Sequence, residues 1–460
     1  NVTETIGSIS DDNSGWGMIT LNGLVNGSTL RVESGTFTGD ITGGGVNSVS
    51  LEKYGAGTLT LEGYNDYRGD TSITGGVLEV SEDENLGSTG GWITDPSRLL
   101  FDGGTLSTLA SFETERDTVL ESGGGTFRTK NNSVLTHSGS ISGDGALVKR
   151  GNGVLVLEGD NSYADGTEIY NGTVRVSSDS NLGDASGDLL LKGGKLRVID
   201  DMATARTTRL RGTGGEFSIK NGYTLTHSGL IRGQGALSKL GQGTLKLNAA
   251  NSYQGGTVIE NGQVIVANSQ AMGTGPLDFR DGTLSLEVGL NLGGDFTWSG
   301  GTIDSLIGTN TSVIDVSGSL DLTGTGEFLF TPDGGFANKT DYLVLSTNDP
   351  LTYNPASDFT ANNLYGLAPE FKIVGNQLFV NYPATYYAGG PVLQNSAPVN
   401  TPFFADFVVS GNVKTGNTGE SNTIRNLIFQ PGSTLQVYNT LQVTDGRFTV
   451  NGGTGTLNGG

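Results

Sequence analysis

Residues 151–183 read GNGVLVLEGDNSYADGTEIYNGTVRVSSDSNLG, and two other stretches repeat this pattern closely. One is GAGTLTLEGYNDYRGDTSITGGVLEVSEDENLG at 55–87, and the other is GQGTLKLNAANSYQGGTVIENGQVIVANSQAMG at 241–273. Self-similarity of this length is typical of repeat architectures, in which each unit contacts only its neighbours. The chain is therefore first interpreted as a repeat protein.

The spacing of the copies defines the repeat. The equivalent tyrosines Tyr67, Tyr163 and Tyr253 lie 96 and then 90 residues apart. The stretches between the copies are also similar, and His137 corresponds to His227, again 90 residues later. The repeated unit is thus about 90 residues long and extends beyond the quoted segments.

Each copy contains two short alternations of polar and apolar residues, which is the period of a β-strand with one buried face. Thr58–Leu61 is the first of them, and the second is centred on Leu78, so one turn is expected to span the step from Leu59 to Leu78. Gly75-Gly76 lies at a sharp corner, because glycine tolerates positive φ. We predict a parallel β-helix (β-solenoid) with about 20 turns if most of the chain follows this pattern. The predicted core positions are Leu59, Leu61, Leu78, Val80, Leu155, Leu157, Val174, Val176, Leu245, Leu247, Val264 and Val266.

The competing architecture is a β-sandwich or barrel of short antiparallel strands. Such folds explain turns and alternation. They do not naturally explain a 90-residue self-similarity, since each unit would need six or seven strands that close on themselves. The all-β solenoid is therefore preferred.

Composition excludes several classes of protein. The chain has 460 residues, 76 of them glycine, no cysteine and a formal net charge of -21. The charge argues against nucleic-acid partners and against anionic membrane surfaces. The missing cysteine excludes disulfides and thiol chemistry. No apolar stretch approaches the length of roughly 18 residues that a membrane-spanning helix needs, so we expect no direct membrane insertion of this segment. No signal peptide opens the chain, so we expect a mature form or a fragment if it is exported.

The pattern GxGxLxLxGxNxYxGxTxIxxGxLxV resembles the passenger-associated transport repeat of autotransporters. The resemblance implies a right-handed parallel β-helix on a Gram-negative cell surface or outside the cell, and many members of the family are adhesins. The second copy has a Tyr–Gly step one residue longer than the pattern, and the third has Ala249 in place of a glycine. The matching residues of the second copy are Gly151, Gly153, Leu155, Leu157, Gly159, Asn161, Tyr163, Gly166, Thr167, Ile169, Gly172, Val174 and Val176.

The pattern changes along the chain and predicts four sections. Residues 1–290 form a β-solenoid with three repeats, and 291–382 form an atypical solenoid section or cap with heavier aromatic strands. Residues 383–402 carry four prolines and are interpreted as a linker or wrapping loop. Strand patterns restart at 403–460, so two consecutive solenoid segments are one option.

Catalytic chemistry is sought and not assigned. The only histidines, His137 and His227, occupy one repeated position in LTHSG, which favours a structural role because an active site is needed once. Gly183–Gly187 superficially resembles a serine-protease GDSG motif but follows the repeat and is interpreted as a turn. We assign no catalytic, cofactor-binding or metal-binding residue. A polysaccharide-processing β-helix enzyme is kept as a second alternative, although no carboxylate pair stands out.

Two sequence features suggest surface sites. Arg68-Gly69-Asp70 spells an integrin-type tripeptide, although the preferred interpretation is that the repeat produced it by chance. The acidic clusters Glu82–Glu84 and Asp200-Asp201 offer oxygen ligands for Ca²⁺, but a solvated acidic surface is the preferred interpretation.

These observations predict a non-enzymatic, extracellular or surface-bound structural protein. It would form a fibre or an elongated stalk used in adhesion or in an extracellular (biofilm) matrix. The expected partners are the chain itself, through end-to-end stacking into a filament, or host and surface ligands. A discrete passenger adhesin is the alternative.

Overall fold

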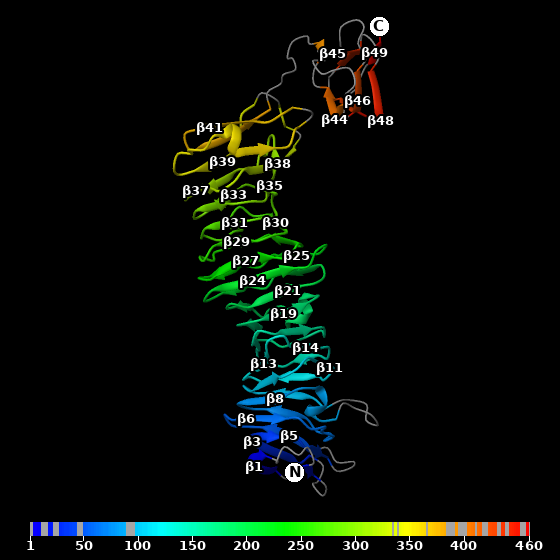
Figure 1. Cartoon of the computed structure of the whole chain (residues 1–460), viewed down its shortest axis with the longest axis vertical. Coiled ribbons are helices and arrows are strands. Elements are labelled where there is room, and N and C mark those ends of the chain that lie inside the picture. Colours follow the sequence, from blue (N-terminus) through cyan, green and yellow to red (C-terminus); the bar gives the residue numbers. More distant parts are fainter. Residues whose placement is uncertain are drawn as a thin grey trace. The chain divides into compact units, whose positions relative to one another are not determined.

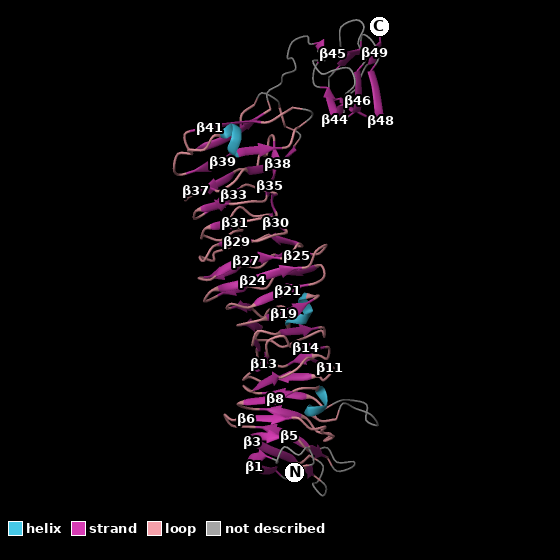
Figure 2. Ribbon diagram, in the orientation of Figure 1, coloured by secondary structure: helices cyan, strands magenta, loops and turns pink. Residues whose placement is uncertain are grey.

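The computed structural model describes residues 3–10, 17–21, 27–43, 49–88, 97–333, 335–337, 340–364 and 367–382, and strands between 392 and 459. Within these residues the chain is almost entirely β-structure, with three one-turn helices (Figure 2). No helix in the described part is long and apolar enough to cross a membrane. Contacts divide the chain into a first unit, Asn1–Thr302 with Ile314–Gly324, and a second unit, Ile303–Val313 with Thr325–Gly460.

The first unit is a stack of short parallel strands (Figure 1). Its elements are β1 (Thr3–Ser10), β2 (Met18–Thr20), β3 (Thr29–Phe37), β4 (Asp40–Thr42), β5 (Ser50–Lys53), β6 (Thr58–Leu61), β7 (Thr71–Ile73), β8 (Val77–Val80), η1 (Asp83–Leu86), β9 (Leu99–Phe101), β10 (Thr105–Thr108), β11 (Phe112–Thr114), β12 (Thr118–Leu120), β13 (Gly125–Thr129), β14 (Val134–His137), β15 (Ile141–Ser142), β16 (Leu147–Arg150), β17 (Val154–Leu157), β18 (Thr167–Ile169), β19 (Thr173–Val176), η2 (Asp179–Leu182), β20 (Leu189–Leu191), β21 (Lys195–Val198), β22 (Met202–Thr204), β23 (Thr208–Leu210), β24 (Gly214–Ile219), β25 (Thr224–His227), β26 (Ile231–Gly233), β27 (Ala236–Leu240), β28 (Thr244–Leu247), β29 (Thr257–Ile259), β30 (Gln263–Val266), β31 (Leu277–Phe279), β32 (Thr283–Leu286), β33 (Leu290–Leu292), β34 (Phe296–Trp298), β36 (Ile314–Val316) and β37 (Leu320–Leu322).

A complete turn of the stack contributes strands to three faces. The turn β12–β13–β14 pairs in parallel with β9, β10 and β11 before it, and with β15, β16 and β17 after it. The predicted parallel β-solenoid is confirmed, with about 14 turns. The expected 20 turns were too many, because that number assumed the short step from Leu59 to Leu78 throughout, whereas one turn can be as long as the chain from Thr71 to Leu99.

The interior is one column of aliphatic and aromatic side chains. Inward residues alternate with outward ones in the short strands, so neighbouring turns bring like positions into register. All twelve core positions named from the sequence are at most 1% exposed. Burial of so many aliphatic side chains is the main stabilising contribution.

Equivalent strands of the second and third repeats lie in different sheets. β16 pairs with β13 and β18, but its counterpart β27, 90 residues later, belongs to the sheet of β24 and β29. β17 lies in that same 11-stranded sheet, and its counterpart β28 lies in the next one. One repeat therefore equals a whole number of turns plus one sheet position.

The second unit changes strand direction. β39 (Tyr342–Thr347) pairs antiparallel with β42 (Gln377–Asn381), which pairs antiparallel with β41 (Glu370–Val374) across the Gly375-Asn376 turn. Gly375 has φ +62°, as a two-residue hairpin turn requires. Its other elements are β35 (Thr302–Ile307), β38 (Gly326–Pro332), α1 (Pro355–Asp358), β40 (Phe359–Ala361), β43 (Val392–Leu393), β44 (Phe403–Val409), β45 (Asn412–Thr415), β46 (Asn422–Phe429), β47 (Thr434–Val437), β48 (Leu441–Val450) and β49 (Leu457–Gly459).

The strands from β43 onward pair in parallel again, in the sets β43-β45-β47-β49 and β44-β46-β48. The linker expected at 383–402 lies outside the described residues, apart from β43. The division into four sections stays a prediction.

Candidate functional site

The repeat motif builds a polar clasp where a turn lacks a strand. In the second copy the Asn161 side chain accepts from Ile141 N at 2.8 Å and donates to Asn181 O at 2.6 Å, so it joins three successive turns. The buried Tyr163 and Thr167 hydroxyls are 2.6 Å apart, and Thr167 donates to Leu182 O at 3.2 Å. These bonds replace the strand pairing that is missing there.

The other two copies make the same clasp. Asn65 and Asn251 each bridge the turns before and after them. Tyr67 and Tyr253 are fully buried, and each hydroxyl contacts a threonine four residues later. Because each repeat advances by one sheet position, the three clasps lie on three successive faces of the first unit.

A buried arginine closes the clasp of the second copy. Arg206 Nε donates to Asp179 Oδ1 at 2.9 Å, and its Nη2 donates to the carbonyls of Asp179 (3.0 Å) and Gly183 (2.7 Å). Its Nη1 donates to the carbonyls of Asp184 and Gly187. Every N–H of the guanidinium head therefore points at an oxygen, which is how a buried cation is accommodated.

Arg116 does the same in the first copy, 90 residues earlier. It is 0% exposed and donates to Asp83, Gly87, Ser88 and Ser97. The sequence analysis missed both arginines. The sequence feature that could have predicted them is an arginine that recurs at one repeat position. In both repeats a threonine lies two residues before it and another two residues after it, so all three side chains point to the same face of an extended chain.

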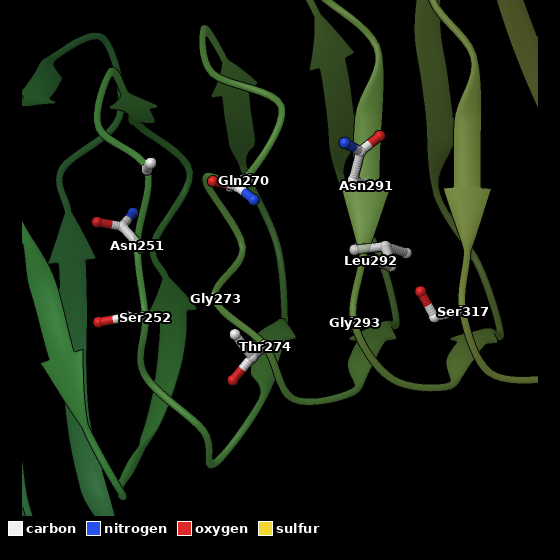
Figure 3. A pocket seen from close by; sticks show the side chains of 10 residues that line it. Asn251, Ser252, Gln270, Gly273, Thr274, Asn291, Leu292, Gly293 and Ser317 are labelled. Atoms are coloured by element: carbon white, nitrogen blue, oxygen red, sulfur yellow. The ribbon is translucent and has the colours of Figure 1, made fainter.

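The third copy has no such arginine. It is two residues shorter between Gly273 and Leu277, so Gly294 takes the place of Arg206 and Ser269 takes that of Asp179. A groove of about 410 Å³ lies beside this clasp (Figure 3). Its lining is neutral and mostly amide or hydroxyl: Ala250, Asn251, Ser252, Gln270, Gly273, Thr274, Asn291, Leu292, Gly293 and Ser317.

Three inward lysines hold the glycine corners. Lys149 Nζ donates to the carbonyls of Arg150 and Gly151, both at 2.7 Å, and of Asn171 at 3.3 Å. Lys53 and Lys239 make equivalent bonds. Burial lowers the pKa of Lys149 to about 7 and that of Lys239 to about 8. The sequence feature that could have predicted these buried lysines is a lysine at the same inward strand position of each repeat.

The two histidines are buried and neutral. A carbonyl can only accept, so His137 Nδ1 carries the proton that bonds Gly139 O at 3.2 Å, and its Nε2 accepts from the Thr118 hydroxyl at 2.8 Å. His227 repeats this arrangement with Gly229 and Thr208. Burial lowers the pKa of both imidazoles to about 4. Both ring nitrogens are therefore occupied: Nε2 joins the histidine to the turn before it, and Nδ1 binds a carbonyl two residues later.

The first unit should lose stability as the pH falls from about 6.5 to about 4. The unfolded chain takes up protons near pH 6.5, while the folded histidines stay neutral until about 4, so protonation favours unfolding. The loss is about 3 kcal/mol for each histidine. Urea unfolding across this range measures it. A His137→Gln/His227→Gln variant should have a flatter profile between pH 5 and 7, and equal slopes would contradict the assignment.

The Arg68-Gly69-Asp70 tripeptide lies against neighbouring turns. Gly69 is buried and its N–H donates to Val49 O at 2.9 Å. The Asp70 carboxylate accepts from Arg98 Nη2 at 2.7 Å and Nε at 3.3 Å. An engaged carboxylate and a buried glycine favour the structural interpretation, and the adhesion role stays a prediction.

We expect Arg68→Ala to bind integrin-bearing cells as well as the parent does. Asp70 is held by Arg98, so removing the Arg68 side chain changes no contact that presents the carboxylate. Cell attachment measured by flow cytometry tests this. A clear drop with Arg68→Ala, and none with the exposed control Arg232→Ala, would establish the tripeptide as an adhesion loop.

The acidic and serine-containing segments lie in η1 or in the connections between strands. Asp83 binds Arg116, and the Asp201 carboxylate accepts from Thr224 N at 2.7 Å. The Asp184 carboxylate accepts from Ser186 N and Oγ, which lowers its pKa. Within the described ranges no three acidic or histidine side chains gather to hold a metal. Calcium binding stays an untested expectation.

The three clasp segments match one known protein family. Residues 51–80, 147–176 and 237–266 match the passenger-associated-transport-repeat. The chain carries three passenger-associated transport repeats. The resemblance found in the sequence is confirmed, and a passenger of this kind lies at the bacterial surface or outside the cell.

Relatives support the same assignment. The chain is 30% identical to the adhesin BmaC autotransporter of Brucella suis over 99% of this chain and 13% of that protein. It is 26% identical to the probable autotransporter YfaL of Escherichia coli over 86% of this chain and 35% of that protein. It is 29% identical to the E. coli lipoprotein YdeK over 54% of this chain and 15% of that protein. The chain thus spans a minor part of each of these relatives.

Proposed function

We propose that this chain is a non-enzymatic, rigid adhesin stalk that presents binding surfaces away from the bacterial cell. The observation that carries the proposal is the use of buried polar groups. Arg116, Arg206 and Lys149 each donate to a backbone carbonyl of a neighbouring turn. His137 Nε2 accepts from the Thr118 hydroxyl of the turn before it. Groups tied in this way hold a scaffold and leave no free acid–base pair in the described interior. The relative named an adhesin supports the same role.

Display on bacteria tests the proposal. Cells that export this chain through an autotransporter domain should attach to host cells or matrix better than cells that export an unrelated solenoid of equal length. Purified chain should compete for attachment. Equal attachment by both strains would refute the adhesin role. Release of sugars from acidic glycans by purified chain would favour the polysaccharide-processing enzyme instead.

A finer form of the proposal is end-to-end assembly into a filament. Parallel turns stack edge to edge, and an unpaired strand edge accepts a strand from another chain. Such stacking supports a fibre or matrix component. Negative-stain imaging of purified chain separates the two forms. Continuous filaments with a regular axial repeat are the result expected for a fibre. Isolated rods would refute filament assembly and remain consistent with the adhesin stalk.

A further inference from the structure

The middle of the chain differs in charge from the rest. Residues 128–246 contain 15 Lys and Arg against 11 Asp and Glu, although the whole chain has 26 against 47. Basic side chains therefore gather on one part of an otherwise acidic solenoid. Since fields from clustered charges attract ions of the opposite sign, this part is the place to look for an anionic ligand.

Four of these turns present a basic ladder at one corner. Tyr170 N bonds Lys149 O, Lys192 N bonds Ile169 O, and Arg211 N bonds Leu191 O, so these backbone bonds step from turn to turn. The ladder consists of Arg150, Tyr170, Lys192 and Arg211, one residue on each turn. Successive turns are about 4.8 Å apart. Arg150, Lys192 and Arg211 are exposed, and Tyr170 is half-buried.

Tyr170 organises the ladder. Arg150 Cζ lies 4.1 Å from its ring centroid and Lys192 Nζ lies 5.3 Å from it, from the turns before and after. Burial and a hydrogen bond with Glu168 raise the pKa of the hydroxyl. Cation–π contact of this kind holds long basic side chains in place without neutralising their charge. The ladder is thus ordered before any ligand arrives.

The ladder cations have no acidic partner within the described residues. Arg31, Arg98 and Arg280 elsewhere on the surface each bind a carboxylate within 3.0 Å. Arg150, Lys192 and Arg211 form no such pair in the described part of the chain, and neither do Arg175 and Arg197, which face each other across β19 and β21. Like charges placed side by side without a counter-ion favour a ligand with several negative groups.

We propose that this ladder binds a linear acidic polysaccharide that bears sulfate or carboxylate groups. Its cations lie two turns and then one turn apart along the stack, so a chain with repeated anionic groups can contact all three. Nucleic acid is disfavoured, because the Tyr170 ring is occupied by cations and offers no face for base stacking. The inference rests on the proposed function only in requiring that the ladder face the outside of the cell.

Binding of dextran sulfate to the full chain tests the inference. Calorimetry at low salt should detect dextran sulfate, and neither neutral dextran of equal length nor single-stranded poly(dT) should bind comparably. The variant Arg150→Ser/Lys192→Ser/Arg211→Ser should bind dextran sulfate at least about tenfold more weakly, with a shallower salt dependence. The matched control Arg31→Ser/Arg98→Ser/Arg280→Ser changes the net charge equally and should bind like the parent.

Three outcomes would overturn the inference: no binding by the parent, equal loss in both triple variants, or tighter binding of poly(dT) than of dextran sulfate. Thermal unfolding of each variant shows that the fold is retained. If dextran sulfate does not bind but displaying bacteria attach normally, the ladder's binding role is refuted and the adhesin stalk is retained. If dextran sulfate binds normally but displaying bacteria do not attach, the adhesin role is refuted and the ladder's binding role is retained.

Discussion

Replacing Arg206 with methionine should lower the free energy of unfolding by about 3–5 kcal/mol, because it leaves Asp179 charged and buried carbonyls without donors. Methionine keeps much of the volume and removes all five N–H donors. The turn that follows η2 should open locally. Urea unfolding measures the loss, and hydrogen exchange of the amides between Asp179 and Leu189 locates it.

The matched control is Arg209→Met, three residues away. Arg209 binds Asp188, but its side chain is 40% exposed, so the loss should stay below about 1 kcal/mol. Adding Asp179→Asn to Arg206→Met should recover part of the stability, since it removes the unpaired charge. The third copy supports this, because it lacks both charges. Equal losses for Arg206→Met and Arg209→Met would contradict the clasp.

Gly183→Ala should destabilise the second clasp by about 3 kcal/mol or more, through backbone strain and a collision. Gly183 has φ +83°, and an added Cβ would lie 2.6 Å from Tyr163 O and 2.7 Å from its ring. Tyr163 is fully buried, so it has no space to move away. Thermal unfolding measures the effect.

Gly222→Ala isolates the collision from the strain. Gly222 has φ +86°, almost the same as Gly183, but a Cβ there meets no atom within 4 Å. This control should cost only about 1 kcal/mol. If both substitutions cost the same, the contact with Tyr163 is not what requires glycine at position 183.

The sequence was sufficient for the strands and the core because both depend on a period of two. Leu155 and Leu157 have the parity and the residue type of buried positions. Lys149 and His137 have the same parity but the residue types of a surface, so their burial depends on groups that neighbouring turns contribute, Asn171 O and the Thr118 hydroxyl. The stacking register determines which groups of the neighbouring turns lie beside these side chains, and a local sequence pattern does not contain that register.

Two larger features also escaped prediction. The change to antiparallel pairing at β39 and β42 depends on which edge the returning strand meets, although the aromatic strands themselves were expected. The Arg68-Gly69-Asp70 tripeptide could be read in the sequence, but its ion pair with Arg98 depends on a residue 28 positions further along the chain. A motif that is present in the sequence can therefore be occupied by contacts between turns and so be inaccessible to a ligand.

The one-position advance of each repeat points the three clasps in three directions around the axis of the first unit. If the proposed adhesin binds receptors through these three faces, a flat layer of receptors would contact only one face at a time. An increase in avidity from simultaneous binding would then require receptors on flexible tethers long enough to reach more than one face of the solenoid. A mesh that surrounds the protein satisfies this geometry, whereas a smooth planar target does not.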